Sequence, residues 1–181
     1  MSVTILAISG SLRAKSSNSL VLEAAARLAG DGVAVVRYRG LAELPHFNPD
    51  LDGADPHPAV ATLRTQVAAA DAVLISSPEY AHGVPGALKN GLDWLVSGIE
   101  IVGKPIGLLN ASPRSTHAQA SLVETLTVMT AALIPGASRT VSLSGRRLDV
   151  DEILADPSLR EPIEAAVGAL AAAARASGKV T

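Results

Sequence analysis

Short runs of apolar residues alternate with longer Ala- and Leu-rich stretches, and this alternation is the feature that most constrains the fold. Residues 3–8 form a run that is apolar except for Thr4 and that stops at Ser9 and Gly10, as expected of a parallel strand buried on both faces. Comparable runs predict strands over residues 33–36, 72–77, 105–111 and 139–143. The stretches between them predict helices over residues 18–29, 58–70, 85–96, 117–133 and 157–176, and residues 39–58 a long surface loop.

This order predicts an α/β fold, a five-stranded parallel sheet with helices on both faces, because each right-handed crossover must cover the sheet. The 181 residues are expected to form a single domain over 1–181. Ligands of such sheets bind beyond the carboxyl ends of the strands. The loops of residues 10–17, 78–84 and 112–116 should therefore carry the function.

Composition narrows the classes of function. The chain has no cysteine, which excludes disulfides, thiolate metal sites and thiol nucleophiles. Its net charge is -2 and no basic cluster occurs, so no nucleic-acid partner is expected. We also expect no membrane partner, because no apolar stretch reaches about 18 residues. The first residues lack the features of a signal peptide, so we expect a cytoplasmic protein.

The first loop has the composition of an anion site. It joins a buried strand to a helix start, where free N–H groups and the helix dipole favour a negative charge. Ser11, Ser16, Ser17 and Asn18 add neutral donors, and Arg13 adds a charged one. The pattern predicts a bound phosphate; the alternative is plain helix capping by Ser and Asn.

The loop after the third strand is stiff. Prolines at 78 and 85 and glycines at 83 and 86 restrict it, which suits a surface that holds a flat ring. Tyr80 can lie beside such a ring as an apolar plate with a polar tip. The alternative is an ordinary turn with a surface aromatic.

Taken together, these motifs resemble the NADPH-dependent FMN reductase family, which includes chromate and quinone reductases and azoreductase-like proteins. The resemblance rests on Gly10-Ser11-Leu12-Arg13 with Ser16 and Asn18, then on Ser77-Pro78-Glu79-Tyr80, and finally on Pro85-Gly86, Leu88-Lys89-Asn90 and Asp93-Trp94-Leu95.

The resemblance implies an enzyme that binds FMN and uses NADPH or NADH as co-substrate. Hydride would pass to N5 of FMN and then, by ping-pong kinetics, to a quinone, a free flavin, an azo compound or an oxidised metal ion. The chemistry would take place on the flavin, so no catalytic side chain is expected. The implied FMN-binding residues are Ser11, Arg13, Ser16, Ser17 and Asn18 at the phosphate, Pro78, Glu79, Tyr80, Ala81, His82 and Gly83 at the isoalloxazine ring, and Ser112 at its other side.

The resemblance also implies a homodimer or homotetramer formed through the helix of residues 85–96, with Asp93 and Trp94 as interface and packing residues. The chain departs from the family at Ala81 and His82, where many relatives have Asn and Gly. The loop of residues 110–116 also lacks the paired glycines often found there. Its Arg114 is either a contact for the phosphate of the pyridine nucleotide or a solvated arginine.

Three other interpretations compete. A flavodoxin-like electron carrier would bind FMN without reacting with NAD(P)H, although such carriers tend to be more acidic than this chain. A serine hydrolase would need the motif G-x-S-x-G, which is absent. The His and Asp residues of the loop 39–58 lack the spacing of a metal site and are expected to be solvated; these are His46, Asp50, Asp52, Asp55 and His57. His82 is expected to line the pocket and His117 to be structural.

Overall fold

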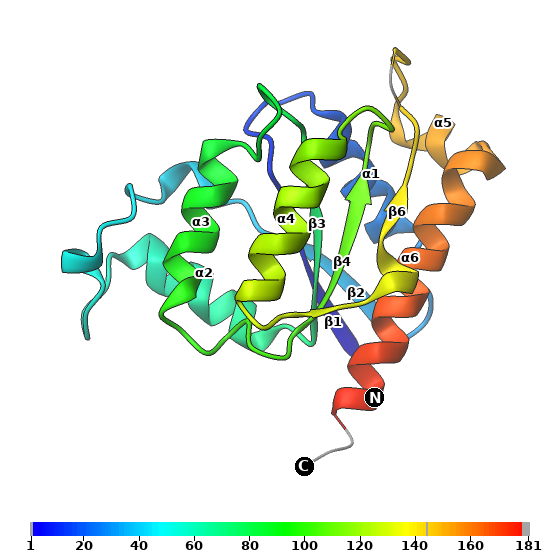
Figure 1. Ribbon diagram of the computed structural model, residues 1–181. Coiled ribbons are helices and arrows are strands. Elements are labelled where there is room, and N and C mark those ends of the chain that lie inside the picture. The colour runs from blue at the N-terminus through cyan, green and yellow to red at the C-terminus, as the bar shows by residue number, and fades with distance from the viewer. Residues whose placement is uncertain (1, 144, 179–181) are drawn as a thin grey trace.

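The computed structural model describes residues 2–143 and 145–178 and has a central parallel sheet (Figure 1). Its strand order is β2-β1-β3-β4-β5. Val3 pairs with Val33 and Ile5 with Ala72, so the two neighbours of β1 are in register with it. The strands are β1 (Val3–Ser9), β2 (Val33–Arg37), β3 (Ala72–Ser76), β4 (Pro105–Asn110) and β5 (Ala132–Leu133). The predicted five-stranded α/β fold is confirmed.

Helices cover both faces of the sheet and enclose two cores (Figure 1). Successive side chains of a strand point to opposite faces, so Ile5 and Ala7 join one core while Leu6 and Ile8 join the other. The first core is closed by α1 (Ser17–Arg27), α5 (Val150–Ala155) and α6 (Pro157–Ser177). The second is closed by α2 (Pro58–Ala69), α3 (Gly86–Val96) and α4 (Thr116–Val128). Among the helices of the described residues, none has both the length and the apolar content to cross a bilayer.

The far edge of the sheet corrects two predicted elements. The predicted helix 117–133 ends at Val128, and its last two residues form β5 instead. The predicted strand 139–143 is shortened to β6 (Arg139–Thr140), and both β5 and β6 pair with β4. A 3₁₀ turn over Pro135–Ala137 separates them. Pro135 cannot donate to the ladder, and Gly107 of β4 lets the turn approach. A Cβ at position 107 would lie 2.7 Å from the Cβ of Ala137 and 2.8 Å from its carbonyl oxygen.

Helix α5 was not predicted. The signal for it is present as Asp149 followed three residues later by Glu152, whose side chains and backbone N–H groups form a reciprocal capping box. The predicted helix 85–96 begins one residue later than expected, because Pro85 occupies the position before its first turn.

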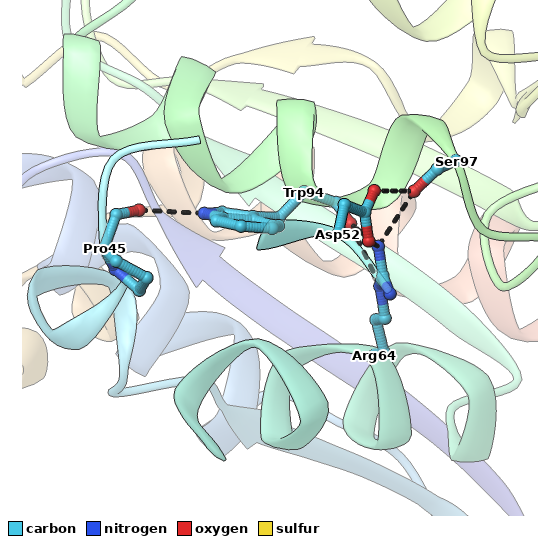
Figure 2. A network of polar contacts seen from close by, with 5 residues as sticks. All are labelled: Pro45, Asp52, Arg64, Trp94 and Ser97. Atoms are coloured by element: carbon cyan, nitrogen blue, oxygen red, sulfur yellow. Dashed lines mark hydrogen bonds and ion pairs between the residues drawn. The ribbon is translucent and has the colours of Figure 1, made fainter. Parts of the chain in front are cut away.

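The long loop of residues 39–58 is not simply solvated; a polar network ties it to α2 and α3 (Figure 2). Trp94 is fully buried, and its Nε1 donates to the carbonyl of Pro45 over 2.8 Å. Arg64 donates from Nε and Nη2 to the carbonyl of Trp94, and from Nη2 to Asp52 over 2.8 Å. The hydroxyl of Ser97 donates to the other oxygen of Asp52. The packing role predicted for Trp94 is confirmed.

Asp52 is therefore a structural residue. Its side chain is only 8% exposed, in contrast to the solvated position expected for it. The hydrogen bond from Ser97, followed by that from Arg64, holds its pKa below the usual range. His57 is likewise engaged, because its Nδ1 accepts from the N–H of Ala59 at the start of α2.

Candidate functional site

Buried polar side chains gather where the parallel strands end. Burial of a polar group is unfavourable unless the group is hydrogen-bonded or faces a ligand, so such a gathering marks a candidate site. Within the described residues, the polar residues that are buried as a whole are Ser11, Ser16, Asn18, Ser76, Ser77 and Asn110, all at or just beyond the carboxyl ends of β1, β3 and β4.

A cavity of about 270 Å³ opens at this edge of the sheet. Its walls combine the loops after β1, β3 and β4 with the segment after β6. They are formed by Ser11, Arg13, Ser16, Ser17, Asn18, Ser77, Pro78, Glu79, Tyr80, Ala111, Ser112, Ser115, Leu143, Gly145 and Arg146. The structure thus brings together all the predicted site residues except Ala81, His82 and Gly83. Their roles in binding stay predictions.

The helices that follow β1, β3 and β4 differ from the others in how they begin. Helices α2, α5 and α6 start under a side-chain cap from His57, Asp149 and Asp156. At α1, α3 and α4, which follow β1, β3 and β4, the side chain of the N-cap residue forms no hydrogen bond to the first turn. At α1, first-turn N–H groups therefore remain available beside Ser16, and these are the groups that bind anions at a helix start.

The loop after β1 is held against β3. The N–H of Gly10 donates to the carbonyl of Ser76 over 2.8 Å, and the hydroxyl of Ser76 donates to Oδ1 of Asn18 over 2.9 Å. The oxygen of the Asn18 amide is thus engaged in fixing α1 to the sheet. A Cβ at position 10 would lie 2.9 Å from both the Oγ of Ser77 and the Cδ2 of Leu88, so glycine permits this close approach.

The loop after β3 ends in a tight turn. Tyr80 and Gly83 exchange backbone hydrogen bonds of 3.1 and 2.9 Å, and the two residues between them have positive φ, 48° at Ala81 and 59° at His82. Asn and Gly are the residues that the two central positions of such a turn favour. Ala81, His82 and Gly83 form the tip of the loop rather than the cavity wall, which differs from the pocket-lining position expected of His82.

His82 instead contacts the start of α4. Its ring stacks on that of His117, with centroids 4.2 Å apart and planes inclined by 14°. Nearby, Oε2 of Glu79 accepts from the N–H of Ala118 over 2.9 Å, so a carboxylate from one loop caps the helix that follows another. Both contacts fix the loop after β3 relative to α4. The structural role predicted for His117 is consistent with this stack.

The loop after β4 is shaped by its own polar groups. The side chain of Asn110 accepts from the N–H of Ser112 over 3.1 Å and donates to the carbonyl of Ser115 over 3.3 Å. Ser112 and Ser115 both face the cavity, whereas Arg114 is exposed and does not line it. The position of Arg114 favours the solvated interpretation.

A second cavity of about 350 Å³ adjoins the first, and Arg13 and Tyr80 belong to both. Its other walls are mostly apolar or backbone and come from Gly10, Leu12, Pro85, Gly86 and Ala87. Leu12 and Tyr80 are 56% and 51% exposed, large values for apolar or aromatic side chains. The edge of the sheet thus offers a polar cavity beside an apolar one.

Several residues of the cavity wall were not predicted as site residues from the sequence. Ser77 and Ala111 are the last residues of the predicted strands 72–77 and 105–111, and the rule that ligands bind at strand ends could have found them. Leu143, Gly145 and Arg146 follow a strand whose end was misplaced, so their position could not be predicted. Among the described residues, no three His, Asp or Glu side chains come together as a metal site would require.

Comparisons with known proteins agree with this geometry. The model of the family described as NADPH-dependent FMN reductase matches residues 3–144. The chain is 33% identical over 173 residues to an NAD(P)H-dependent FMN reductase of Pseudomonas aeruginosa, with 93% of each chain covered. It is 33% identical over 111 residues to a quinone reductase of Escherichia coli, which covers 60% of this chain and 59% of that one. Among solved structures it is similar to FerB, a flavoenzyme NAD(P)H:(acceptor) oxidoreductase from Paracoccus denitrificans, with a TM-score of 0.72, 26% identity and coverage of 94% and 98%.

Proposed function

The chain belongs to the NADPH-dependent FMN reductase family, and from that premise we propose how its residues carry out a reductase reaction. It is an oxidoreductase with FMN as cofactor and NADPH or NADH as co-substrate. The acceptor in this proposal is a small molecule of the quinone type, in line with the name of the Escherichia coli relative. The family match favours this function over an electron carrier and over a serine hydrolase.

The observation that carries the site assignment is the cavity at the start of α1, whose groups fit a phosphate. Ser11, Ser16 and Ser17 contribute hydroxyls, Arg13 contributes a guanidinium, and the uncapped helix contributes N–H groups. Arg13 forms no ion pair within the described residues, so its charge is available to an anion. These donors suit the phosphate of FMN, which accepts hydrogen bonds at three oxygens.

The ring end of the cofactor is assigned to the loop after β3. Pro78 and Tyr80 border the polar cavity, and Tyr80 also borders the apolar one, so a ligand with an anionic end and an aromatic end matches the pair of cavities. When bound, FMN supplies the hydride-accepting centre. The side chains hold the phosphate and restrict water at the ring; Glu79 fixes the loop by its bond to Ala118.

An absorbance spectrum tests the proposal. Protein mixed with FMN and then desalted is expected to retain a band near ~450 nm, and anaerobic NADPH or NADH is expected to bleach it. A quinone added afterwards should restore the band. Retained flavin that neither nucleotide bleaches would indicate an electron carrier. A protein that retains no flavin after desalting, and binds none in a titration at any FMN concentration, would overturn the proposal.

Replacing Arg13 tests the phosphate assignment separately. Arg13→Ala should weaken FMN binding by about 1.5–3 kcal/mol, the size of a hydrogen bond to a charged group. Arg175→Ala, an exposed arginine in the last turn of α6, is the matched control and should leave the Kd unchanged. Equal FMN affinity in the Arg13→Ala variant and the wild type would contradict the assignment.

We further propose a homodimer or homotetramer assembled through α3 and its surroundings. Large apolar side chains are exposed there, with Ile99 at 84% and Val128 at 74%, and they are joined by Val96, Val102 and Val123 of the same region. Asp93 is bound to Lys89 of its own helix over 2.6 Å. Light scattering should give a multiple of 18.4 kDa for the wild type and a smaller mass for Ile99→Asp. A monomeric wild type would contradict this part.

We propose that the protein works in the cytoplasm, because the reaction draws on the cell's reduced nicotinamide nucleotides. Fractionation of cells that carry a tagged chain tests this. Recovery with membranes or outside the cell would contradict it.

A further inference from the structure

Arg146 brings a second cationic side chain to the polar cavity from a part of the chain that the family match does not reach. The matched residues end at position 144, and the cation that the loop after β1 contributes to the cavity wall is Arg13. We propose that Arg146 is a specificity-determining residue that binds the phosphate of the flavin together with Arg13 and so selects phosphorylated flavin over riboflavin. The inference rests on the function proposed above.

The backbone around Arg146 directs the residue to the cavity. Leu143 is buried at the cavity wall, and the N–H of Arg146 donates to its carbonyl over 3.1 Å, which closes a turn. Gly145 lies inside that turn with φ of 76°, a conformation that residues with a side chain rarely adopt. Gly145 itself faces the cavity. The turn thus presents both its glycine and its arginine to the ligand space.

The guanidinium of Arg146 has one ion-pair partner among the described residues. Its Nη2 donates to Oδ2 of Asp156 over 3.0 Å, and the side chains of Arg146 and Asp156 remain 44% and 27% exposed. Hydrogen bonds from Ser158, followed by that from Arg146, keep the pKa of Asp156 below its usual range, so this carboxylate stays an acceptor. A guanidinium has five N–H donors in a fixed fork, and a single partner leaves donors for an anion.

The charge of the cavity supports the same conclusion. A phosphate monoester carries between −1.5 and −2 at neutral pH, on the scale of the phosphorylated side chains. Arg13 supplies one positive charge and the start of α1 about half of one. Glu79, the acidic residue of the wall, already accepts from Ala118. Arg13 and the helix start thus leave at most about half a negative charge of the phosphate uncompensated. Among the cavity walls Arg146 is the remaining cation, and its guanidinium lies between Asp156 and the ligand space.

Flavin titrations of four proteins test the proposal: the wild type, Arg146→Ala, Arg146→Lys and Arg147→Ala. Arg147 is the matched control, because it is an exposed arginine next in sequence and does not line the cavity. Quenching of flavin fluorescence gives a Kd for FMN and a Kd for riboflavin. Arg146→Ala should weaken FMN binding about 10-fold and leave riboflavin binding within twofold, because the lost contact is charge-assisted and specific to phosphate. Arg146→Lys should fall between, and Arg147→Ala should match the wild type.

The outcomes separate the two proposals. If the wild type binds FMN and the Arg146→Ala variant binds it with equal affinity, the role of Arg146 is overturned and the reductase function is unaffected. Equal weakening of FMN and riboflavin also overturns it, because the residue would then act on the part that the two flavins have in common. A wild type that binds neither flavin overturns the proposed function itself. A thermal melt of Arg146→Ala close to that of the wild type is expected, since the Asp156 ion pair lies near the surface.

Discussion

Removal of Arg64 should destabilise the fold without changing the cofactor site. Arg64→Ala deletes the donors to the carbonyl of Trp94, to Asp52 and to Ser97. It leaves the Asp52 carboxylate, 8% exposed, with the Ser97 hydroxyl as its remaining side-chain partner. Hydrogen bonds to charged groups contribute about 1.5–3 kcal/mol each, and they do not add fully because one guanidinium makes them all; we expect a loss of about 2–4 kcal/mol.

Chemical denaturation at pH 7 measures this loss, and the melting temperature should fall by about 10 °C. Arg160→Ala is the control, because its ion pair with Glu164 spans 3.6 Å on the surface and should contribute less than about 0.5 kcal/mol. FMN affinity should be retained, since Arg64 binds the last turn of α3 whereas the cavity residues precede and begin that helix. A loss no larger than that of the control would refute the reasoning.

The same variant has a pH signature. The pKa of Asp52 is lower in the folded state, so its stabilising effect is complete above its unfolded pKa of about 3.9 and is lost as the pH falls through the folded value. The difference in stability between wild type and Arg64→Ala should therefore narrow in acid, at about pH 3, relative to pH 7. A constant difference would show that Asp52 does not contribute through its charge.

Three further substitutions probe single positions. Tyr38→Phe should raise the unfolding free energy by about 1 kcal/mol, because the buried hydroxyl has no hydrogen-bond partner among the described residues. Burial raises the pKa of Tyr38 to about 12, with a smaller effect of Glu43, so wild-type stability should fall from about pH 10 towards pH 12 and that of the variant should fall less over this range. Gly107→Ala should cost about 1–3 kcal/mol in urea titrations, since its Cβ would meet the backbone oxygen of Ala137. Ala81→Asn should raise the melting temperature by about 1–2 °C, because Asn tolerates positive φ better than Ala, and an unchanged or lower value would contradict the strain assigned to this turn.

The central strands and the site loops were predictable because their signals are local. A parallel strand buried on both faces leaves a continuous apolar run, as residues 72–76 do, and a loop that follows such a run must lie at the ligand edge of the sheet. The sequence alone therefore predicts that the residues of the first loop lie at this edge of the sheet. For residues such as Ser11 and Arg13, their position directly after the first strand is enough for this prediction.

What could not be predicted depends on contacts between distant segments. Ala132 and Leu133 have helix-compatible side chains, and only the ladder of β4 makes them a strand. Asp52 is charged and lies in a polar loop, and nothing nearby in sequence reveals Arg64 as its partner. Arg146 lies beyond β6, which begins only after the turn at Pro135–Ala137 and pairs with the distant β4. In each case tertiary structure overrides the local preference.

The interrupted edge strand also affects how copies of this chain can associate. An unbroken edge offers a row of free N–H and C=O groups on which another chain can add a strand. Here β5 and β6 contribute two residues each, and the turn at Pro135–Ala137 packs against α6 between them. On this side of the sheet, strand addition has too short a template to extend one sheet into the next. At this edge, contacts between folded copies are thereby directed to helical surfaces, where assembly can stop at a closed number of subunits, whereas β2 at the opposite edge is unbroken over five residues.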